Sequence, residues 1–354
     1  MSIGTKGEGL IFVISQPRAG STLLQRMLGG HPDIHTIGEP WLMLYPLYAL
    51  RSQGYEAEYS APTARPAVHE FLSTLPNGEE EYLEGVRRMC TYLYRRALEA
   101  SGKRYFLDKT PRYYLIIPEL LRAFPEAHFI ILLRNPLSML SSILDTWIKQ
   151  QWSWVYYFKS DLVRAPRLLL EGTGLLGERG LVIHYEHLVT DPETEMRKVC
   201  AMLGEDFTPE MVEYNRRNLP HWQYGDQEDV YRHTRPVALY AQKWVEAIRD
   251  PQVWRLASDY LQWLGRETVE QMGYAYDELE QTLAANKPNR ARLWLTFPLA
   301  WYLEEQMEKR RKWERGVARL THALRRGGVK GGAAATTSQK ASLAASSASN
   351  LPHT

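Results

Sequence analysis

A buried strand that runs directly into a tight turn and a helix is the feature that most constrains this chain. The apolar run Leu10–Ser15 precedes the turn "QPRAGST" at residues 16–22, and an apolar-periodic stretch typical of a helix begins at Ser21. Backbone N–H groups and the positive end of a helix dipole meet at such a turn, so it can bind an anion. The same pattern also fits a turn with a purely structural role.

Further apolar runs alternate with helical patterns along the chain. Runs typical of buried strands cover Leu10–Ser15, Arg104–Leu107, His128–Leu133 and Leu181–Tyr185. Helical patterns cover Ser21–Gly29, Glu79–Ser101, Tyr113–Phe124, Pro136–Gln150, Pro192–Leu203 and Val237–Glu246. This alternation predicts an α/β fold in which one parallel β-sheet is flanked by helices.

The composition changes toward the C-terminus. We predict a main domain over residues 1–285, a helical basic extension over 286–330 and a disordered low-complexity tail over 331–354. In the extension, the apolar stretch "LWLTFPLAWYL" precedes the basic residues between Lys309 and Lys330. Such a composition suits a weak peripheral membrane contact. Alternatively, the aromatic residues pack on the main domain while the basic helix is solvated.

The charge distribution bounds the classes of partner. The whole chain has a net charge of +2, but residues 309–354 alone carry ten Lys and Arg and one Glu. The rest of the chain is therefore mildly acidic. This argues against nucleic-acid binding. Two cysteines, Cys90 and Cys200, cannot form a disulfide framework, and the first residues do not resemble a secretory signal. We therefore expect a cytoplasmic protein, and no apolar run approaches the roughly 20 residues of a membrane-spanning helix.

A second stretch, "FIILLRNPLSMLSSIL", also joins a strand to a helix. The apolar strand ends at Arg134, and the following helix places Ser138 and Ser142 on one face. A magnesium-dependent nucleotidase would carry an acidic residue at the end of such a strand, and its phosphate loop would carry a lysine after Gly20. The arginine instead suggests a nucleotide with phosphates at two separate places, bound without metal.

Together these motifs resemble a known family. "PRAGST" and "LLRNPLSMLSSIL" look like the phosphosulfate loop and the 3′-phosphate site of sulfotransferases that use 3′-phosphoadenosine 5′-phosphosulfate (PAPS), particularly the branch of the tyrosylprotein sulfotransferases. The segments "HPDIHTIGEP", "FLDKTPRY", "VIHYEHLVTDPE" and "QKW" extend the resemblance from about Leu10 to Glu278. The resemblance implies a P-loop-like sulfotransferase fold, PAPS as co-substrate, no metal, and a hydroxylated acceptor.

The resemblance also implies roles for individual residues. The nucleotide-binding positions are Arg18, Ala19, Gly20, Ser21 and Thr22 for the phosphosulfate, Arg134 and Ser142 for the 3′-phosphate, Tyr185 near the adenine, and Lys243. Glu39 matches the general base, and Lys109 together with Arg18 lies close to the transferring group. Ala19 and Ser21 depart from the usual loop, and Pro40 replaces the second glutamate of the family's Glu-Glu pair.

Other interpretations of the same residues remain open. A P-loop nucleotide kinase would need magnesium, and a non-catalytic nucleotide-binding protein would lack a base. His31 or His35 could replace Glu39 as the base, and Asp108 could hold a metal. The aromatic segment "WSWVYYF" at 152–158 suits an acceptor site, a core or a dimer contact. The acceptor's class and the oligomeric state are not specified, since acceptor contacts fall on variable loops such as Trp41–Leu75 and Gln150–Gly174.

Overall fold

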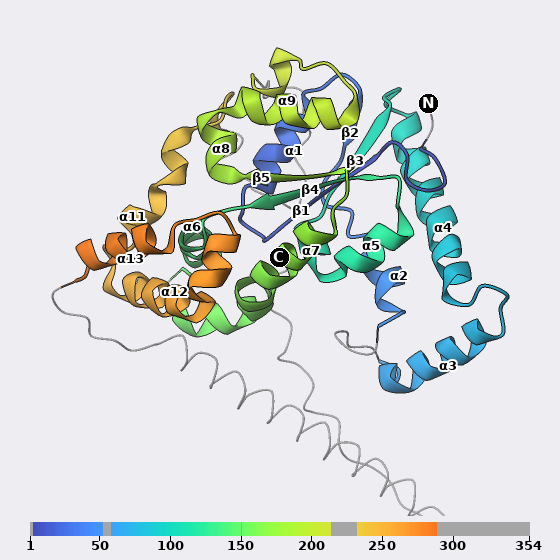
Figure 1. The fold of residues 1–354 in the computed structure, drawn as a ribbon, viewed down its shortest axis with the longest axis horizontal. Coiled ribbons are helices and arrows are strands. Elements are labelled where there is room, and N and C mark those ends of the chain that lie inside the picture. The colour runs from blue at the N-terminus through green and yellow to red at the C-terminus, as the bar shows by residue number, and fades with distance from the viewer. Residues whose placement is uncertain (1–2, 52–57, 150, 214–231, 289–354) are drawn as a thin grey trace, which may run out of the picture. The chain divides into compact units, whose positions relative to one another are not determined.

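A five-stranded parallel sheet forms the centre of the computed structural model, which describes residues 3–51, 58–149, 151–213 and 232–288 (Figure 1). The sheet order is β2-β3-β1-β4-β5. The strands are β1 Leu10–Ser15, β2 Ile34–Thr36, β3 Tyr105–Lys109, β4 His128–Leu133 and β5 Gly180–His184. The predicted α/β class with a parallel sheet is confirmed.

The chain order places a ligand-binding position at the end of β1. This central strand pairs in parallel with β3 on one side and with β4 on the other. The chain leads from β1 through α1 to β2 on one side, and it later crosses from β3 to β4 on the other side, so the strand order reverses at β1 and the sheet opens at its carboxyl edge there. The turn "QPRAGST" follows β1 and lies at that edge.

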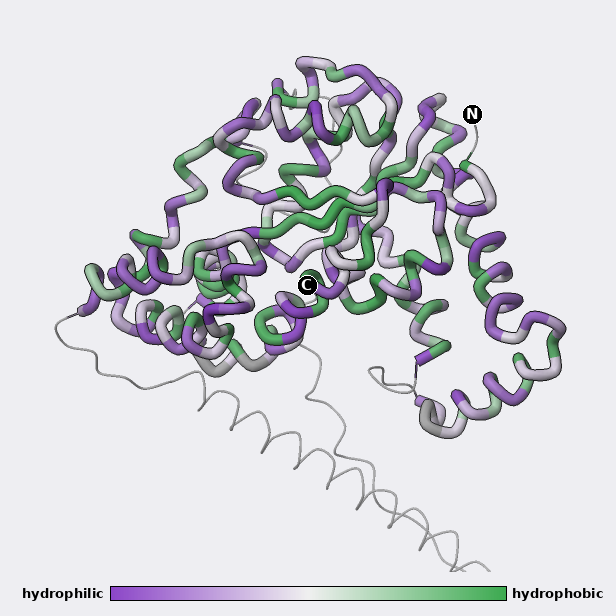
Figure 2. The backbone as a smooth tube through the Cα atoms, viewed as in Figure 1, coloured by the Kyte–Doolittle hydropathy of each residue, from purple (hydrophilic) through white to green (hydrophobic). Residues whose placement is uncertain are grey.

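Helices cover both faces of the sheet. The α-helices are α1 Ser21–Gly29, α2 Leu44–Tyr48, α3 Ala61–Ser73, α4 Glu79–Glu99, α5 Ile117–Ala123, α6 Pro136–Ile143, α7 Ala165–Leu175, α8 Tyr185–Thr190, α9 Pro192–Leu203, α11 Lys243–Ala247, α12 Pro251–Gln271 and α13 Tyr276–Ala285. Helices α1, α8 and α9 pack on one face, and α4, α5 and α7 on the other (Figure 1). The central strands β1 and β4 between them are almost entirely apolar (Figure 2), as expected for a sheet buried on both faces.

Side-chain alternation along the strands sends neighbouring residues to opposite faces. Phe12 and Phe106 belong to the apolar cluster under α4 and α5, whereas Val13 and Leu107 belong to the cluster under α1. On β3, Asp108 therefore faces the α4 side, and Lys109 shares the face of α1.

Three predicted helices differ from the observed ones. The helix predicted over Tyr113–Phe124 is a 3₁₀ helix, η1 Pro111–Ile116, followed by α5. A continuous α-helix is broken there because Pro118 has no backbone N–H to donate. The helix predicted over Pro136–Gln150 is α6 followed by a π-helical turn, η2 Leu144–Ile148.

The helix predicted over Val237–Glu246 is a 3₁₀ helix, η6 Ala238–Ala241, followed by α11. The carbonyl groups of Tyr240 and Ala241 accept hydrogen bonds from Arg134 and Ser138, both in or next to α6. These contacts compete with an uninterrupted α-helical ladder.

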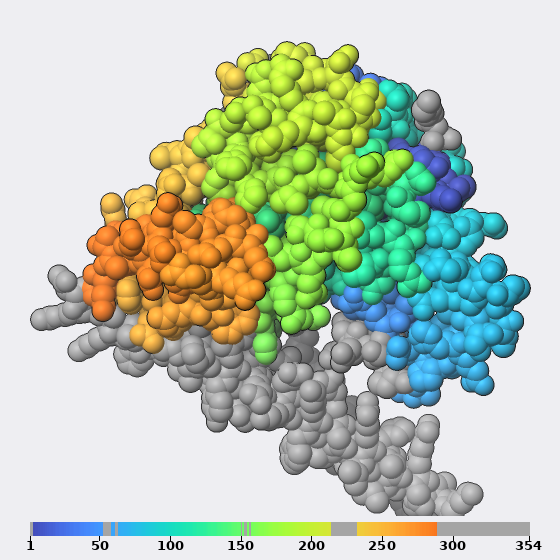
Figure 3. All heavy atoms as spheres, in the orientation of Figure 1, coloured from blue at the N-terminus to red at the C-terminus, as the bar shows by residue number. Residues whose placement is uncertain are grey.

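Helices α6, α11 and α12 lie together at the carboxyl edge of the sheet (Figure 1). On the face shown in Figure 3, the segment around α7 separates α12 and α13 from α3 and α4. Among the described residues, no helix is both long and apolar enough to span a bilayer. The predicted extension after residue 288 and the predicted tail lie outside the described residues.

Candidate active site

The turn after β1 holds two residues in the left-handed backbone region. Arg18 has a φ of 69° and Gly20 a φ of 97°, and the N–H of Ala19 bonds to the carbonyl of Gln16 at 3.2 Å. A Cβ on Gly20 would lie 2.3 Å from Cδ2 of Tyr185. Glycine is therefore required at position 20 for two reasons, the positive φ and the close approach of the Tyr185 ring.

The N-terminus of α1 is open to an anion. Its N-cap residue, Gly20, has no side chain that could cap it, and its first turn carries no acidic residue. Ser21 and Thr22 lie in that first turn and are 4% and 7% exposed. The first N–H groups of a helix have no intrahelical partner, so this buried, uncapped end suits an anionic group.

The N-terminus of α6 is different. Asn135 caps it by accepting hydrogen bonds from the backbone N–H groups of Leu137 and Ser138 at 2.9 and 3.3 Å. Ser138 itself donates to the carbonyl of Ala241 at 3.3 Å. This helix end is satisfied internally, and any anion near it must be bound by side chains.

Arg134 provides such a side chain at the end of β4. Its Nη1 donates to the carbonyl of Arg18 at 2.7 Å, and its guanidinium carbon lies 4.2 Å from the centroid of the Tyr185 ring. Its Nε is buried without a hydrogen-bond partner in the described part of the chain. Burial lowers the pKa of Arg134 from its ordinary value, and Arg18 lowers it further. An anion at this guanidinium would satisfy the Nε and favour the charged form.

Ser142 and Trp147 bring α6 and η2 against the turn. Nε of Arg18 donates to Oγ of Ser142 at 3.3 Å, and the Arg18 guanidinium carbon lies 5.9 Å from the Trp147 ring centroid. Thus Arg18, Arg134, Ser142 and Tyr185, which are far apart in the sequence, meet at one place. Four of the residues predicted to bind the nucleotide are brought together.

A second cluster lies at the adjacent ends of β2 and β3. Nζ of Lys109 donates to Oε1 of Glu39 at 2.6 Å, and the indole Nε1 of Trp41 donates to Oε2 at 3.1 Å. The side chains of Lys109 and Glu39 are 0% and 11% exposed. The Glu39 carboxylate is thus fixed at both oxygens, and each oxygen retains a further lone pair.

Asp108 belongs to a separate buried network on the opposite face. Its Oδ2 accepts from the hydroxyls of Tyr94 and Tyr113 at 2.6 and 2.9 Å, and its Oδ1 accepts from Thr110 at 2.8 Å. Burial raises the pKa of Asp108 to about 6, although the hydrogen bonds from the three hydroxyl groups act to lower it. These donors occupy the carboxylate, so the arrangement supports a structural role for Asp108.

Lys243 lies at the start of α11, which packs against α6. Its Nζ is 3.6 Å from Oδ2 of Asp145, and both side chains are largely exposed. An exposed pair of this kind contributes little to stability and leaves the ammonium group mobile. Lys243 lies beside the helix that carries Ser142 and, in the described part of the chain, forms no hydrogen bond or ion pair with the turn.

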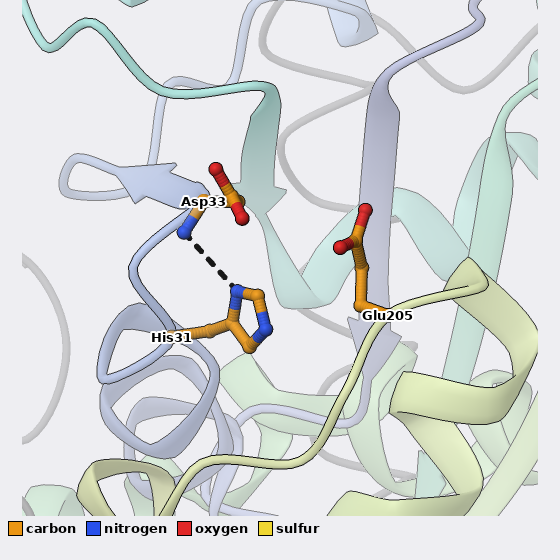
Figure 4. A group of neighbouring side chains, drawn as sticks. All are labelled: His31, Asp33 and Glu205. Carbon is orange, nitrogen blue, oxygen red and sulfur yellow. Dashed lines mark hydrogen bonds between the residues drawn. The ribbon is translucent and has the colours of Figure 1, made fainter.

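His31 belongs to a cluster with Asp33 and Glu205, whose ligand-type atoms lie within 4.8 Å of one another (Figure 4). Nδ1 of His31 accepts the backbone N–H of Asp33 at 3.1 Å, so Nε2 carries the proton and donates to the carbonyl of Asp206 at 3.1 Å. Glu205 pairs with Arg104 at 2.6 Å. With both ring nitrogens engaged, the cluster ties loops together rather than offering metal ligands.

The two candidate histidines are engaged elsewhere in the fold. His31 and Asp33 precede β2, at the amino edge of the sheet, whereas the turn "QPRAGST" lies at the carboxyl edge. His35 packs its ring edge-on against Phe106, with 5.8 Å between the ring centroids, and burial lowers its pKa.

Comparison with known proteins identifies the family of this chain. The Sulfotransferase family profile matches residues 11–209, more than half of the chain. The chain therefore belongs to the sulfotransferase family. The matched region contains the group around Arg18 and Arg134 and the pair of Glu39 and Lys109, whereas Lys243 lies outside it.

Individual relatives and solved structures are similar to this chain over different parts of their length. Nodulation protein NoeE of Sinorhizobium fredii is 33% identical over 216 residues, which cover 56% of this chain and 50% of NoeE. A putative protein-tyrosine sulfotransferase of Caenorhabditis briggsae is 22% identical over 62% of this chain and 74% of its own length. The chain thus spans about half the length of NoeE. Among solved structures, the sulfotransferase domain of the Synechococcus PCC 7002 olefin synthase covers 75% of this chain and 94% of its own, at 23% identity and a TM-score of 0.49.

Proposed function

We propose that this protein transfers the sulfuryl group of PAPS to a hydroxyl group of an acceptor, without a metal ion. The observation that carries the proposal is the joint placement of Arg18, Arg134 and the uncapped N-terminus of α1 at the carboxyl end of β1. These groups form two adjacent places for anions. The buried Nε of Arg134 lacks a partner in the described residues, and a 3′-phosphate would supply one.

The two anion-binding places differ in their donors. At the first, α1 contributes backbone N–H groups, the hydroxyls of Ser21 and Thr22 and the helix dipole, which suits the phosphosulfate. At the second, Arg134 and Ser142 offer side-chain donors, which suits the isolated 3′-phosphate. Tyr185 lies between them and against Gly20. Its ring would support the adenosine portion, and Lys243 would approach the nucleotide from α11.

The cluster of Glu39 and Lys109 supplies the groups for the chemical step. As the S–O bond to the nucleotide phosphate breaks, its electron pair stays on the phosphate oxygen, and the acceptor oxygen forms the new bond to sulfur. Lys109 and Arg18 stabilise the charge that develops on the leaving phosphate. Glu39 accepts the acceptor's hydroxyl proton. A singly charged sulfuryl group needs no metal bridge between two phosphates, so arginine and lysine suffice.

A transfer assay tests the proposal. The purified protein is incubated in EDTA with PAPS carrying labelled sulfate and with hydroxylated lipids, sugars, phenols and tyrosine peptides. We expect label in at least one acceptor class, with stoichiometric formation of 3′-phosphoadenosine 5′-phosphate (PAP). If turnover appears only with ATP and magnesium, the sulfuryl-transfer proposal is wrong and the protein is a kinase.

We further propose a cytoplasmic location, because Cys90 and Cys200 are both free and buried thiols.

The predicted membrane contact of residues 286–330 falls almost entirely outside the described residues. If this contact exists, we expect that removal of residues 305–354 abolishes co-sedimentation with anionic vesicles at low salt, while PAP binding is retained. Equal sedimentation of both proteins would contradict it.

A further inference from the structure

Trp41 follows Glu39 by two residues and has an unusual backbone conformation. Its φ of 55° is in the left-handed region, which a bulky residue rarely adopts and which indicates strain. The backbone N–H of Trp41 donates to Oγ1 of Thr110 at 3.3 Å, and this hydroxyl in turn donates to Asp108 at 2.8 Å. The strained residue is therefore tied to the buried Asp108 network. Strain of this kind persists where the surrounding contacts fix it, often at functional sites.

The Trp41 side chain is held between two groups. Its indole Nε1 donates to Oε2 of Glu39 at 3.1 Å. The guanidinium carbon of Arg112 lies 5.6 Å from its ring centroid, within the range of a cation–π contact. One edge of the indole therefore holds the carboxylate, while Arg112 restrains the ring.

Arg112 is itself fixed by a bidentate ion pair. Its Nε and Nη2 donate to the two carboxylate oxygens of Asp161 at 3.1 and 2.9 Å. The carbonyl of Asp161 accepts from Nε2 of Gln16, the first residue of the anion-binding turn, at 2.8 Å. A continuous set of contacts therefore joins the turn to Glu39 through the segment around Asp161, Arg112 and Trp41.

We propose that Trp41 is a positioning residue, which orients the Glu39 carboxylate through the indole N–H. This inference rests on the proposed function, because it assigns Trp41 to the same reaction. Lys109 holds Oε1 and Trp41 holds Oε2, so the carboxylate has one defined orientation. The remaining lone pairs can then meet the acceptor hydroxyl without rotation of the side chain.

The Trp41→Phe variant tests this inference, since it keeps an aromatic ring and removes the N–H. We expect kcat to fall roughly 10- to 100-fold through misorientation of the base. The KM values for PAP and for the acceptor should hardly change, because the loss concerns the orientation of the base and not substrate binding. PAP affinity and the thermal unfolding midpoint should stay close to wild type. Trp263→Phe is the matched control, because Trp263 lies on α12 with 45% of its surface exposed; its kcat should not change.

A second variant and a reference variant separate the possible outcomes. Arg112→Lys keeps the charge beside Asp161 but loses the planar, bidentate group, so it should lower kcat less than Trp41→Phe and also leave the KM values close to wild type. If Glu39→Gln is inactive and Trp41→Phe keeps the kcat of wild type, the positioning role is wrong while the function stands. If Glu39→Gln retains full turnover, the base assignment and this inference both fail.

Discussion

Replacement of Glu39 by Gln should lower kcat by about 10²–10⁴ while PAP affinity hardly changes. The carboxylate is proposed to accept the acceptor's proton, and an amide cannot accept it. The nucleotide, in contrast, is proposed to contact Arg18, Arg134 and the N-terminus of α1. The two sites are adjacent but use different side chains. Steady-state kinetics with a verified acceptor, together with calorimetric PAP binding, measures both effects.

The matched control for this substitution is Glu126→Gln. Glu126 pairs with Arg179 at 3.0 Å, and both side chains are substantially exposed, so loss of this charge should leave kcat unaltered. Unaltered turnover in Glu39→Gln itself would contradict the assignment of the base, and His35 would then be the next residue to replace.

Replacement of Gly20 by Ala should weaken PAP binding at least roughly tenfold. A Cβ at this position would lie 2.3 and 2.5 Å from Cδ2 and Cε2 of Tyr185. It would also be forced into a φ of 97°, and the left-handed region costs an L-residue roughly 1–2 kcal/mol. Either the turn or the tyrosine ring must move, and both are proposed to contact the nucleotide. Calorimetric titration with PAP measures the loss, which corresponds to about 1.4 kcal/mol per factor of ten.

Gly85→Ala provides the control for this prediction. Gly85 lies inside α4, and a Cβ there would meet nothing within 4 Å. We expect this variant to keep PAP affinity and to gain roughly 0.5–1 kcal/mol of stability from helix propensity. A Gly20→Ala protein that binds PAP as tightly as wild type would show that the turn does not contact the nucleotide.

Local sequence signals predicted several elements with their observed ends. The strand His128–Leu133 and the helix Pro192–Leu203 agree with the prediction. The helix begins after Asp191, which caps it, and it ends at Gly204 in the left-handed conformation. These start and stop signals act over a few residues and can be read from the sequence.

Other elements depend on contacts that the sequence does not display. The strand Ile34–Thr36 is only three residues long, too short for a recognisable alternation, and it exists because β3 pairs with it. The helix Pro251–Gln271 was not predicted, and its pattern is interrupted by a non-helical Gly265. Helix α6 passes into a π turn, which places Trp147 near Arg18.

In the candidate site, too, the sequence predicted some features and not others. The motifs predicted which residues gather at the carboxyl edge, because parallel strands end together there. They could not predict that Arg134 donates to the carbonyl of Arg18 or that Asn135 caps α6. The Asn-Pro pair before that helix was an available signal for the cap. The contact of Trp41 with Glu39 depends on a left-handed backbone residue and could not be inferred from the motif.

Calorimetric titration with PAP and with AMP, both in EDTA, tests the central claim most directly. The claim is that Arg134 and Ser142 bind a 3′-phosphate while α1 and Arg18 bind the 5′-phosphosulfate, without metal. The account predicts clear binding of PAP and a much weaker affinity for AMP, which lacks the 3′-phosphate. Equal affinity for the two nucleotides, or binding only when magnesium is present, would contradict it.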